Sequence, residues 1–219
     1  MTLSETLAAA KGILFDMDGV LIDSEPVHEE AIVALSGELG DPIGDKALLF
    51  SFKGAPEKNM AARFLEIYPA TNLTVEDIIR RKVEIFSDLF VGVELVPGAM
   101  EFVQASHAAG RKHGLTTSAT RITQQQAFAT FGFGPYFETI ITGGDIQRGK
   151  PDPEPYLLTA GRLGLQPSEC IVIEDSINGV LSGKAAGCAV IALTTTFPRE
   201  DLAKAGADFI VDSFAELEA

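Results

Sequence analysis

The amino-acid sequence predicts an α/β protein, in which a Rossmann-like parallel sheet with helices on both faces is interrupted by an inserted helical-bundle domain. Two observations lead to this fold class. Short apolar segments alternate with segments of helical character over most of the chain. After the first apolar segment this alternation stops for roughly 90 residues, far more than one crossover helix needs.

Six short apolar segments are predicted to be buried strands. They are continuously apolar rather than alternating, as expected for strands that are covered on both faces. They span residues 13–15, 113–116, 139–142, 170–173, 189–193 and 209–211.

Helical segments lie between the later strands, and each of them ends at a glycine. Several also begin at a proline, and this asymmetry is typical of helix termini. Strands that alternate with helices in this way imply right-handed crossovers and a parallel sheet. We therefore assign residues 1–23 and 95–219 to the α/β core. The five helical segments are residues 97–110, 121–132, 153–164, 176–187 and 198–206.

The interval between the first and second strands is predicted to form a helical domain, residues 24–94. Its apolar residues recur at helical spacing over residues 26–39, 56–68 and 75–90, which argues against a long unstructured loop. Thr74, followed three residues later by Asp77, predicts a capped helix start.

Composition excludes several functional classes. Seventeen Lys and Arg against 31 Asp and Glu give a net charge of −14, which disfavours binding to nucleic acid or to anionic membranes. The short basic run at residues 80–82 is interpreted as a solvated helix face. With no signal-like N-terminus and no long apolar segment, we expect a cytoplasmic protein. Cys170 and Cys188 are predicted to be free, buried thiols.

Polar and charged residues follow four of the predicted strands, either directly or after a loop. In an open parallel sheet, ligands bind outside the carboxyl ends of the strands, so these residues are the candidates for a site. Taken singly, most of them are also explained as helix caps or turn residues. The candidates are Asp16, Asp18, Thr117, Ser118, Lys150, Glu174 and Asp175.

Taken together, the candidates predict phosphoryl-transfer chemistry. Carboxylates that converge on one sheet edge repel one another unless a cation compensates, and a set of oxygen ligands favours Mg²⁺. Asp16 and Asp18 project to the same side of an extended backbone. The first can attack phosphorus, and the second can protonate the leaving oxygen and later activate water. Lys150 and the Thr117 hydroxyl would stabilise the phosphoryl oxygens.

These residues stand in four motifs, "DMDGVLIDSEPVH", "LTTSA", "GKPDPEPY" and "IVIEDSINGVLSGKAAG". In this order and spacing the chain resembles the haloacid dehalogenase superfamily, within its capped phosphatase and β-phosphoglucomutase-like subfamily. The resemblance covers nearly the whole chain and implies that residues 24–94 form the family's helical cap. Two departures are Ala119, where a second serine is common, and Glu154, where Asp is common.

The resemblance also implies a role for each residue of the site. Asp16 would be the nucleophile, Asp18 the general acid/base, Thr117 the phosphate-binding hydroxyl and Lys150 the charge-stabilising lysine. The metal ligands would be Asp16, the Asp18 backbone carbonyl and Asp175, with Glu174 acting nearby or through water.

The leading expectation is a magnesium-dependent phosphatase that acts on a small phosphorylated metabolite through an aspartyl-phosphate, most simply as a monomer. The alternative is a sugar phosphomutase of the β-phosphoglucomutase type. His28 matches a histidine of that enzyme, although capped phosphatases often have one there too. Glu57 stands where the mutase has an arginine that binds the second phosphate, and the flanking Lys53 and Lys58 are the candidates to replace that arginine. An inactive binding module is a third possibility. Substrate selectivity is expected from Ser118, His28, Lys53, Glu57 and Lys58.

Overall fold

The computed structural model describes residues 1–55 and 57–217. The chain divides into two compact units, which we call the core unit (Met1–Asp23 and Leu95–Ala219) and the inserted unit (Ser24–Glu94). A two-stranded sheet pairs β2 (Ile22–Asp23) with β3 (Glu94–Leu95), where the chain passes from one unit to the other and back.

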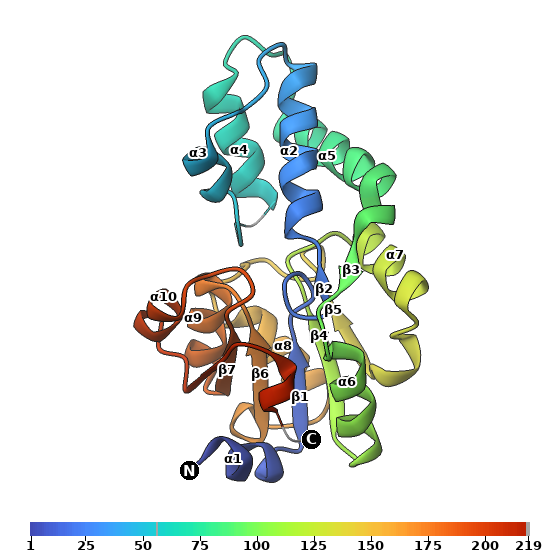
Figure 1. The fold of residues 1–219 in the computed structure, drawn as a ribbon, viewed down its shortest axis with the longest axis vertical. Helices are drawn as coiled ribbons and strands as arrows, with labels where there is room; N and C mark the ends of the chain where they lie inside the picture. The colour runs from blue at the N-terminus through green and yellow to red at the C-terminus, as the bar shows by residue number, and fades with distance from the viewer. Residues whose placement is uncertain (56, 218–219) are drawn as a thin grey trace. The chain divides into compact units, whose positions relative to one another are not determined.

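The core unit contains a six-stranded parallel sheet in the order β5-β4-β1-β6-β7-β8 (Figure 1), which confirms the predicted fold class. Phe15 at the end of β1 is in register with Leu115 of β4 and with Ile173 of β6. The carboxyl ends of these three strands therefore lie at the same level of the sheet. The strands are β1 (Gly12–Phe15), β4 (Lys112–Thr116), β5 (Thr139–Ile141), β6 (Cys170–Glu174), β7 (Ala189–Leu193) and β8 (Phe209–Val211).

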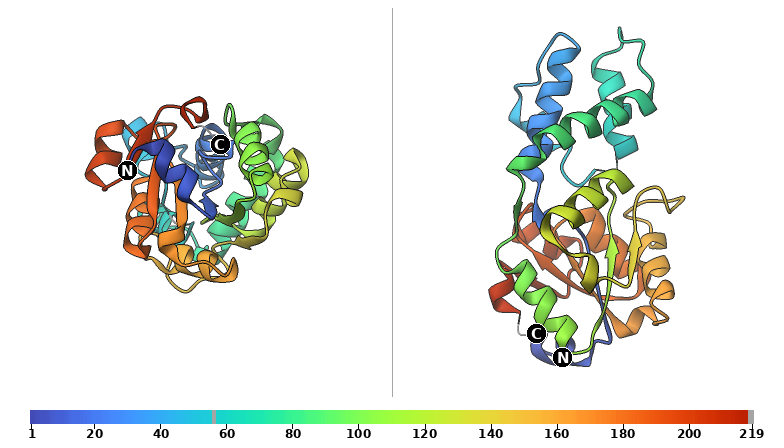
Figure 2. Two further views of the ribbon diagram at one scale, coloured as in Figure 1. Left: turned by 90° about the horizontal axis from the view of Figure 1, so that it is seen from below. Right: turned by 90° about the vertical axis from the view of Figure 1, so that its right-hand side faces the viewer.

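Helices cover both faces of this sheet, because consecutive residues of a strand point to opposite sides. Leu14 belongs to an apolar cluster with residues of α8, α9 and α10, whereas the ring of Phe15 packs edge-on against Phe102 of α6. Viewed along the strands, α6 lies across the sheet from α8 and α9 (Figure 2). The helices are α6 (Ala99–Ala108), α7 (Arg121–Phe131), α8 (Glu154–Arg162), α9 (Ile177–Ala186) and α10 (Arg199–Lys204).

Short elements were missed by the sequence prediction. The helix α1 (Leu3–Ala9) has only seven residues and starts at a capping box in which Thr2 and Glu5 bond to each other's backbone N–H groups. The five-residue helix α3 (Lys46–Phe50) is capped by Asp45, whose side chain accepts from the backbone N–H groups of Ala47 and Leu48. Helices this short bury too few apolar residues to leave a clear periodic pattern.

Among the described residues, the inserted unit contains the short helix α3 and three longer helices, α2 (Glu25–Glu38), α4 (Glu57–Ile67) and α5 (Val75–Leu89), followed by a single 3-10 turn at Phe90–Gly92. The predicted cap at Thr74 is confirmed, since its hydroxyl accepts from the Asp77 N–H and Asp77 bonds back to Thr74. The predicted start of the second helix, Pro56, lies outside the described residues. Within the described residues, no helix has the length and apolarity needed to cross a membrane.

One prediction about the inserted unit is wrong. The basic run at residues 80–82 was interpreted as a solvated face, but the side chain of Lys82 is buried. Arg80 and Arg81 are solvated, and each forms surface ion pairs. The two cysteines are free and buried, as predicted.

Candidate active site

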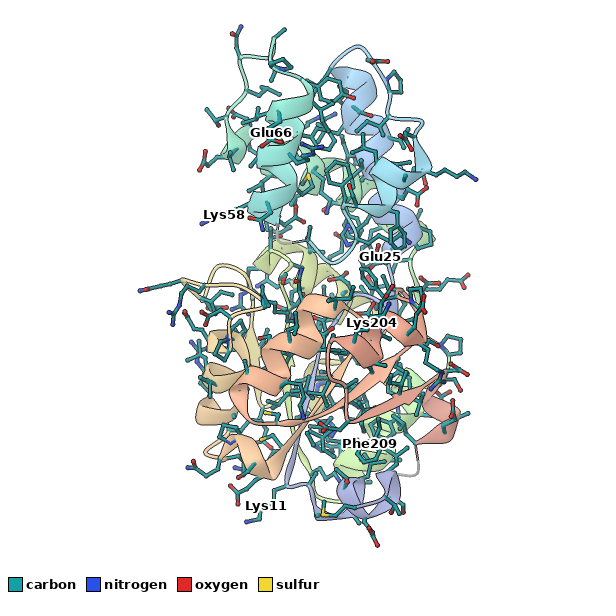
Figure 3. All side chains as sticks on the ribbon, turned by 90° about the vertical axis from the view of Figure 1, so that its left-hand side faces the viewer. Lys11, Glu25, Lys58, Glu66, Lys204 and Phe209 are labelled. Atoms are coloured by element: carbon teal, nitrogen blue, oxygen red, sulfur yellow. The ribbon has the colours of Figure 1, made fainter. Side chains whose placement is uncertain are left out.

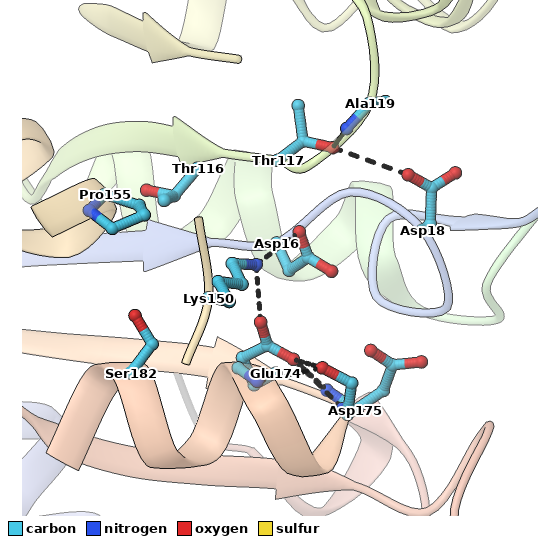
Figure 4. Close-up of polar contacts among 12 residues, drawn as sticks. Asp16, Asp18, Thr116, Thr117, Ala119, Lys150, Pro155, Glu174, Asp175 and Ser182 are labelled. Carbon is cyan, nitrogen blue, oxygen red and sulfur yellow. Dashed lines mark hydrogen bonds and ion pairs between the residues drawn. The ribbon is translucent and has the colours of Figure 1, made fainter. Parts of the chain in front are cut away.

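The predicted site residues of the core unit meet at one edge of the sheet. Asp16 directly follows β1, Thr117 directly follows β4, and Glu174 and Asp175 lie at the end of β6. The loop that precedes α8 brings Lys150 between them (Figure 4). The matched register of the three strands is what places these side chains side by side.

Lys150 joins two of the carboxylates. Its ammonium donates to Asp16 Oδ1 at 2.9 Å and to Glu174 Oε1 at 2.6 Å, and it lies 5.1 Å from the centre of the Tyr156 ring. The Lys150 side chain is only 6% exposed, so solvent screens these contacts little. Lys150 contacts only one oxygen of Asp16, which leaves Oδ2 outside this ion pair.

Both oxygens of Glu174 are held by protein donors. Oε1 accepts from Lys150 and from the Tyr156 hydroxyl at 2.9 Å. Oε2 accepts from the backbone N–H groups of Asp175 and Ser176, each at 3.0 Å, and from the Ser176 hydroxyl at 2.9 Å. The carboxylate also lies against the backbone of α9 at Gly179, where a β-carbon would come within 1.7 Å of Oε1. Glu174 is therefore fixed by its own protein surroundings.

Burial and charge act against each other in this cluster. Burial, together with the smaller effects of the Glu174 and Asp18 carboxylates, raises the pKa of Asp16 to about 7 despite the Lys150 charge. Burial also disfavours the charged form of Glu174, but Lys150 and the hydrogen bonds outweigh it and lower the pKa of Glu174. Lys150 has a raised pKa, because Asp16 and Glu174 outweigh the cost of its burial.

The same edge of the sheet has the composition of a divalent-cation site. Carboxylate oxygens of Asp16, Glu174 and Asp175 lie within 4.8 Å of one another, and all three residues are buried. Lys150 supplies one positive charge against these three carboxylates, so two negative charges remain for a cation to balance. Because Glu174 already accepts at both oxygens, Asp16 and Asp175 are the better direct ligands.

Asp18 and Thr117 face each other beside this cluster. The Thr117 hydroxyl lies 3.4 Å from Asp18 Oδ2 and accepts from the N–H of Ala119 at 3.0 Å. Ser118 is half-buried in the same loop. Gly19 turns the chain with φ 73°, and a β-carbon there would come within 1.9 Å of Asp175 Oδ2. The turn after Asp18 thus packs directly on the carboxylate of Asp175.

Comparison with known proteins identifies the family. Residues 10–187 match the haloacid dehalogenase-like hydrolases. The chain belongs to this family. It is 35% identical over 197 residues to the validoxylamine A 7'-phosphate phosphatase of Streptomyces hygroscopicus subsp. limoneus. The aligned region covers 89% of this chain and 91% of that relative. The predicted enzyme class, phosphoric monoester hydrolase, agrees with the activity for which that relative is named.

Solved structures of similar hydrolases cover nearly the whole chain. CbbY from Rhodobacter sphaeroides in complex with phosphate superposes with a TM-score of 0.84 at 30% identity, over 95% of this chain and 96% of that one. A putative β-phosphoglucomutase from Thermotoga maritima superposes with a TM-score of 0.74 at 29% identity, over 92% of this chain and 94% of that one. The relatives of this hydrolase therefore include a sequence relative named as a phosphatase and a solved structure named as a putative β-phosphoglucomutase.

The selectivity residues predicted for this hydrolase in the inserted unit fall into separate groups. His28 and Glu57 both contact Lys82, whose ammonium lies 2.8 Å from His28 Nδ1 and 2.8 Å from Glu57 Oε1. Lys53 lies 4.0 Å from a carboxylate oxygen of Glu25 instead. Lys58 is exposed on α4 (Figure 3).

Three residues of these networks were not among the predicted site residues. Tyr156 and Ser176 stand inside the recognised motifs, but their apolar and helix-capping positions gave no sign of a contact with Glu174. Lys82 did leave a signal, since it lies four residues after Ile78 and four before Phe86, both buried. That spacing places Lys82 in the apolar stripe of α5.

Proposed function

We propose that this hydrolase is a magnesium-dependent phosphatase that cleaves a phosphate monoester of a small cytoplasmic metabolite through an aspartyl-phosphate on Asp16. One observation carries the proposal: a buried carboxylate, Asp16, directly follows a central strand, with a buried lysine at 2.9 Å and two more carboxylates beside it. The phosphatase activity for which the sequence relative is named supports the same reaction.

In the first step, Asp16 acts as the nucleophile. A carboxylate oxygen of Asp16 forms a bond to phosphorus while the bond from phosphorus to the ester oxygen breaks. Asp18 gives its proton to that leaving oxygen. The Lys150 ammonium and the Thr117 hydroxyl then stabilise charge on the phosphoryl oxygens.

In the second step, the aspartyl-phosphate is hydrolysed. Asp18 is now a carboxylate and takes a proton from water, whose oxygen bonds to phosphorus while the bond to Asp16 breaks. Asp16 and Asp18 return to their starting states, and inorganic phosphate leaves. The Thr117 hydroxyl lies 3.4 Å from Asp18 Oδ2, which supports the assignment of both groups to the same phosphoryl site.

Mg²⁺ fits the charge and donor type of the site. Asp16 and Asp175 would hold it together with the backbone carbonyl of Asp18, while Glu174 orients Lys150. When bound, it would balance the phosphoryl charge and shield the phosphorus from carboxylate repulsion.

We further propose that the inserted unit is the cap and that its residues favour a phosphatase over a mutase. A mutase must hold a second phosphate group, which requires an uncompensated cation. In the inserted unit, the buried Lys82 is instead neutralised by Glu57 at 2.8 Å, and the Glu57 side chain is itself only 18% exposed. This pairing supports recognition of a monophosphate that carries neutral polar groups.

The proposal is tested by assaying phosphate release from a panel of phosphorylated metabolites and from an aryl phosphate with Mg²⁺. Asp16→Asn should lower kcat by at least about 10³-fold, because the amide is not a nucleophile, while circular dichroism and the unfolding midpoint stay close to those of the wild type. The control is Asp23→Asn, an exposed aspartate of the same unit, which should keep full activity. Substantial phosphate release by Asp16→Asn would refute the assignment.

A phosphorus NMR experiment separates the two activities. The enzyme is incubated with a hexose 1-phosphate and a catalytic amount of hexose bisphosphate. A phosphatase produces inorganic phosphate as the monoester signal declines. Interconversion of the two hexose monophosphates without net phosphate release would show a mutase and overturn the proposal.

A further inference from the structure

Tyr156 of α8 is fully buried beside the charged cluster, yet no step of the proposed mechanism uses it. Its hydroxyl donates to Glu174 Oε1 at 2.9 Å, and the centre of its ring lies 5.1 Å from the Lys150 ammonium. Its pKa is raised well above the ordinary value by burial and by the Glu174 charge, so the phenol stays neutral and remains a donor.

Packing alone does not require this hydroxyl. The Tyr156 ring belongs to an apolar cluster that includes Leu14, Val172 and Val180, and a phenylalanine ring would fill the same volume. Burying a hydroxyl group costs free energy unless it is hydrogen-bonded. The hydroxyl in this position therefore points to a role at the carboxylate that it contacts.

The contact acts on the oxygen of Glu174 that Lys150 uses. Oε2 has three donors from Asp175 and Ser176, just before α9, whereas the donors to Oε1 among the described residues are Lys150 and Tyr156. The hydroxyl thus shares the negative charge of Oε1 with the ammonium. By sharing it, Tyr156 limits how strongly Glu174 attracts Lys150 away from Asp16.

We propose that Tyr156 is a positioning residue, whose hydroxyl on Glu174 Oε1 and ring beside the ammonium keep Lys150 against the nucleophile Asp16. The inference rests on the proposed phosphatase function. Without the hydroxyl, Glu174 Oε1 accepts from Lys150 alone, and the ammonium shifts toward Glu174. The ion pair with Asp16, now at 2.9 Å, then lengthens.

The test compares Tyr156→Phe with Tyr136→Phe, which removes the same atom from a half-buried tyrosine whose hydroxyl bonds only to Gln104 among the contacts described. With an aryl phosphate and Mg²⁺, Tyr156→Phe should lower kcat roughly 10-fold, because a misplaced charge-stabilising group affects the transition state more than binding. KM should change less than about twofold. Tyr136→Phe should leave both constants unchanged.

A double-mutant cycle shows whether Tyr156 acts through Glu174. If it does, Tyr156→Phe should cost less than about twofold in kcat when Glu174 is already Gln, because coupled residues are not additive. An equal loss in both backgrounds would overturn the inference. So would an unchanged kcat in Tyr156→Phe.

A readout that does not depend on turnover separates this inference from the proposed function. The ¹⁵N ammonium signal of Lys150, assigned by its loss in Lys150→Arg, should shift in Tyr156→Phe and stay in place in Tyr136→Phe. If the wild-type enzyme releases no phosphate but the Lys150 signal still shifts in Tyr156→Phe, the proposed phosphatase function is refuted and the contact between Tyr156 and the Lys150 site is supported. An active enzyme whose Lys150 signal is identical in Tyr156→Phe would refute the positioning role alone.

Discussion

Replacing Gly179 with alanine tests whether the position of Glu174 governs catalysis. Gly179 lies in the first turn of α9. Because it has no side chain, the Glu174 carboxylate can pack directly against the helix backbone at this position. An alanine β-carbon would lie 1.7 Å from Oε1 and 1.8 Å from the carboxylate carbon. Ordinary contacts of this kind are about 3.4 Å or longer, so the carboxylate or the helix must move by about 1.7 Å.

A displacement of that size cannot leave the Glu174 hydrogen bonds intact. They have lengths between 2.6 and 3.0 Å, and hydrogen bonds to a charged group contribute about 1.5–3 kcal/mol each. Loss of two such bonds exceeds the roughly 1 kcal/mol that alanine gains over glycine in a helix. We expect the free energy of unfolding to fall by about 3 kcal/mol. With Lys150 no longer held in place, kcat should fall about 100-fold.

The matched control is Gly161→Ala in α8. Gly161 is an exposed helical glycine, and a β-carbon there would meet no neighbouring heavy atom within 4 Å. This variant should be as active as the wild type and more stable by about 0.5–1 kcal/mol in urea unfolding. The reasoning is refuted if Gly179→Ala behaves in the same way as Gly161→Ala, with unchanged kcat and equal or greater stability.

Two further predictions concern stability and selectivity. Burial lowers the pKa of His113 from 6.5 to about 4, with smaller effects of His107 and Arg111, so the unfolded chain binds more protons between these values. About 3 kcal/mol of stability contributed by His113 above pH 6.5 should be lost as the pH falls to 4. Because the raised pKa of Asp16 acts in the opposite direction over the same range, the test is a difference: in urea unfolding, the stability of the wild type relative to His113→Gln should fall by about 2 kcal/mol from pH 7.5 to pH 5. Glu57→Gln should raise the kcat/KM ratio of a sugar bisphosphate over its monophosphate roughly 10-fold by freeing the charge of Lys82, while Glu66→Gln, on the exposed part of the same helix, should leave the ratio unchanged. An unchanged ratio in Glu57→Gln would contradict the proposed role of the cap.

The strands were predictable because they are mostly apolar, and the central strands β1 and β6 are buried over their whole length. All six predicted strands begin and end within one residue of the observed ones, and two match at both ends, β7 at Ala189–Leu193 and β8 at Phe209–Val211. A strand that contacts helices on either side has no polar face, so its whole length is apolar in the sequence. The positions that follow such strands are then also fixed, and this is why Asp16 and Thr117 were found.

What each side chain contacts was less predictable, because those contacts join elements that are distant in the sequence. The motif around Glu174 predicts a carboxylate near a metal, but only the fold shows that both of its oxygens accept from protein groups. Tyr156, 18 residues earlier, is one of those donors. The position of a carboxylate at a strand end can therefore be predicted from sequence, whereas its role as metal ligand or lysine partner depends on which donors the neighbouring helices provide.

Lys82 is a residue whose environment was wrongly predicted from its neighbours in the sequence. Its place in a basic run favoured a solvated position, although its spacing from Ile78 and Phe86 put it on the buried stripe of α5. A buried ammonium is stable only beside a partner, and that partner, Glu57, comes from another helix. The basic neighbours of Lys82 therefore predicted an exposed side chain, which is wrong, whereas its helical spacing from buried residues predicts the buried position that is observed. The same rule explains why Arg80, on the opposite side of the helix, is exposed and pairs with Asp77 at the surface.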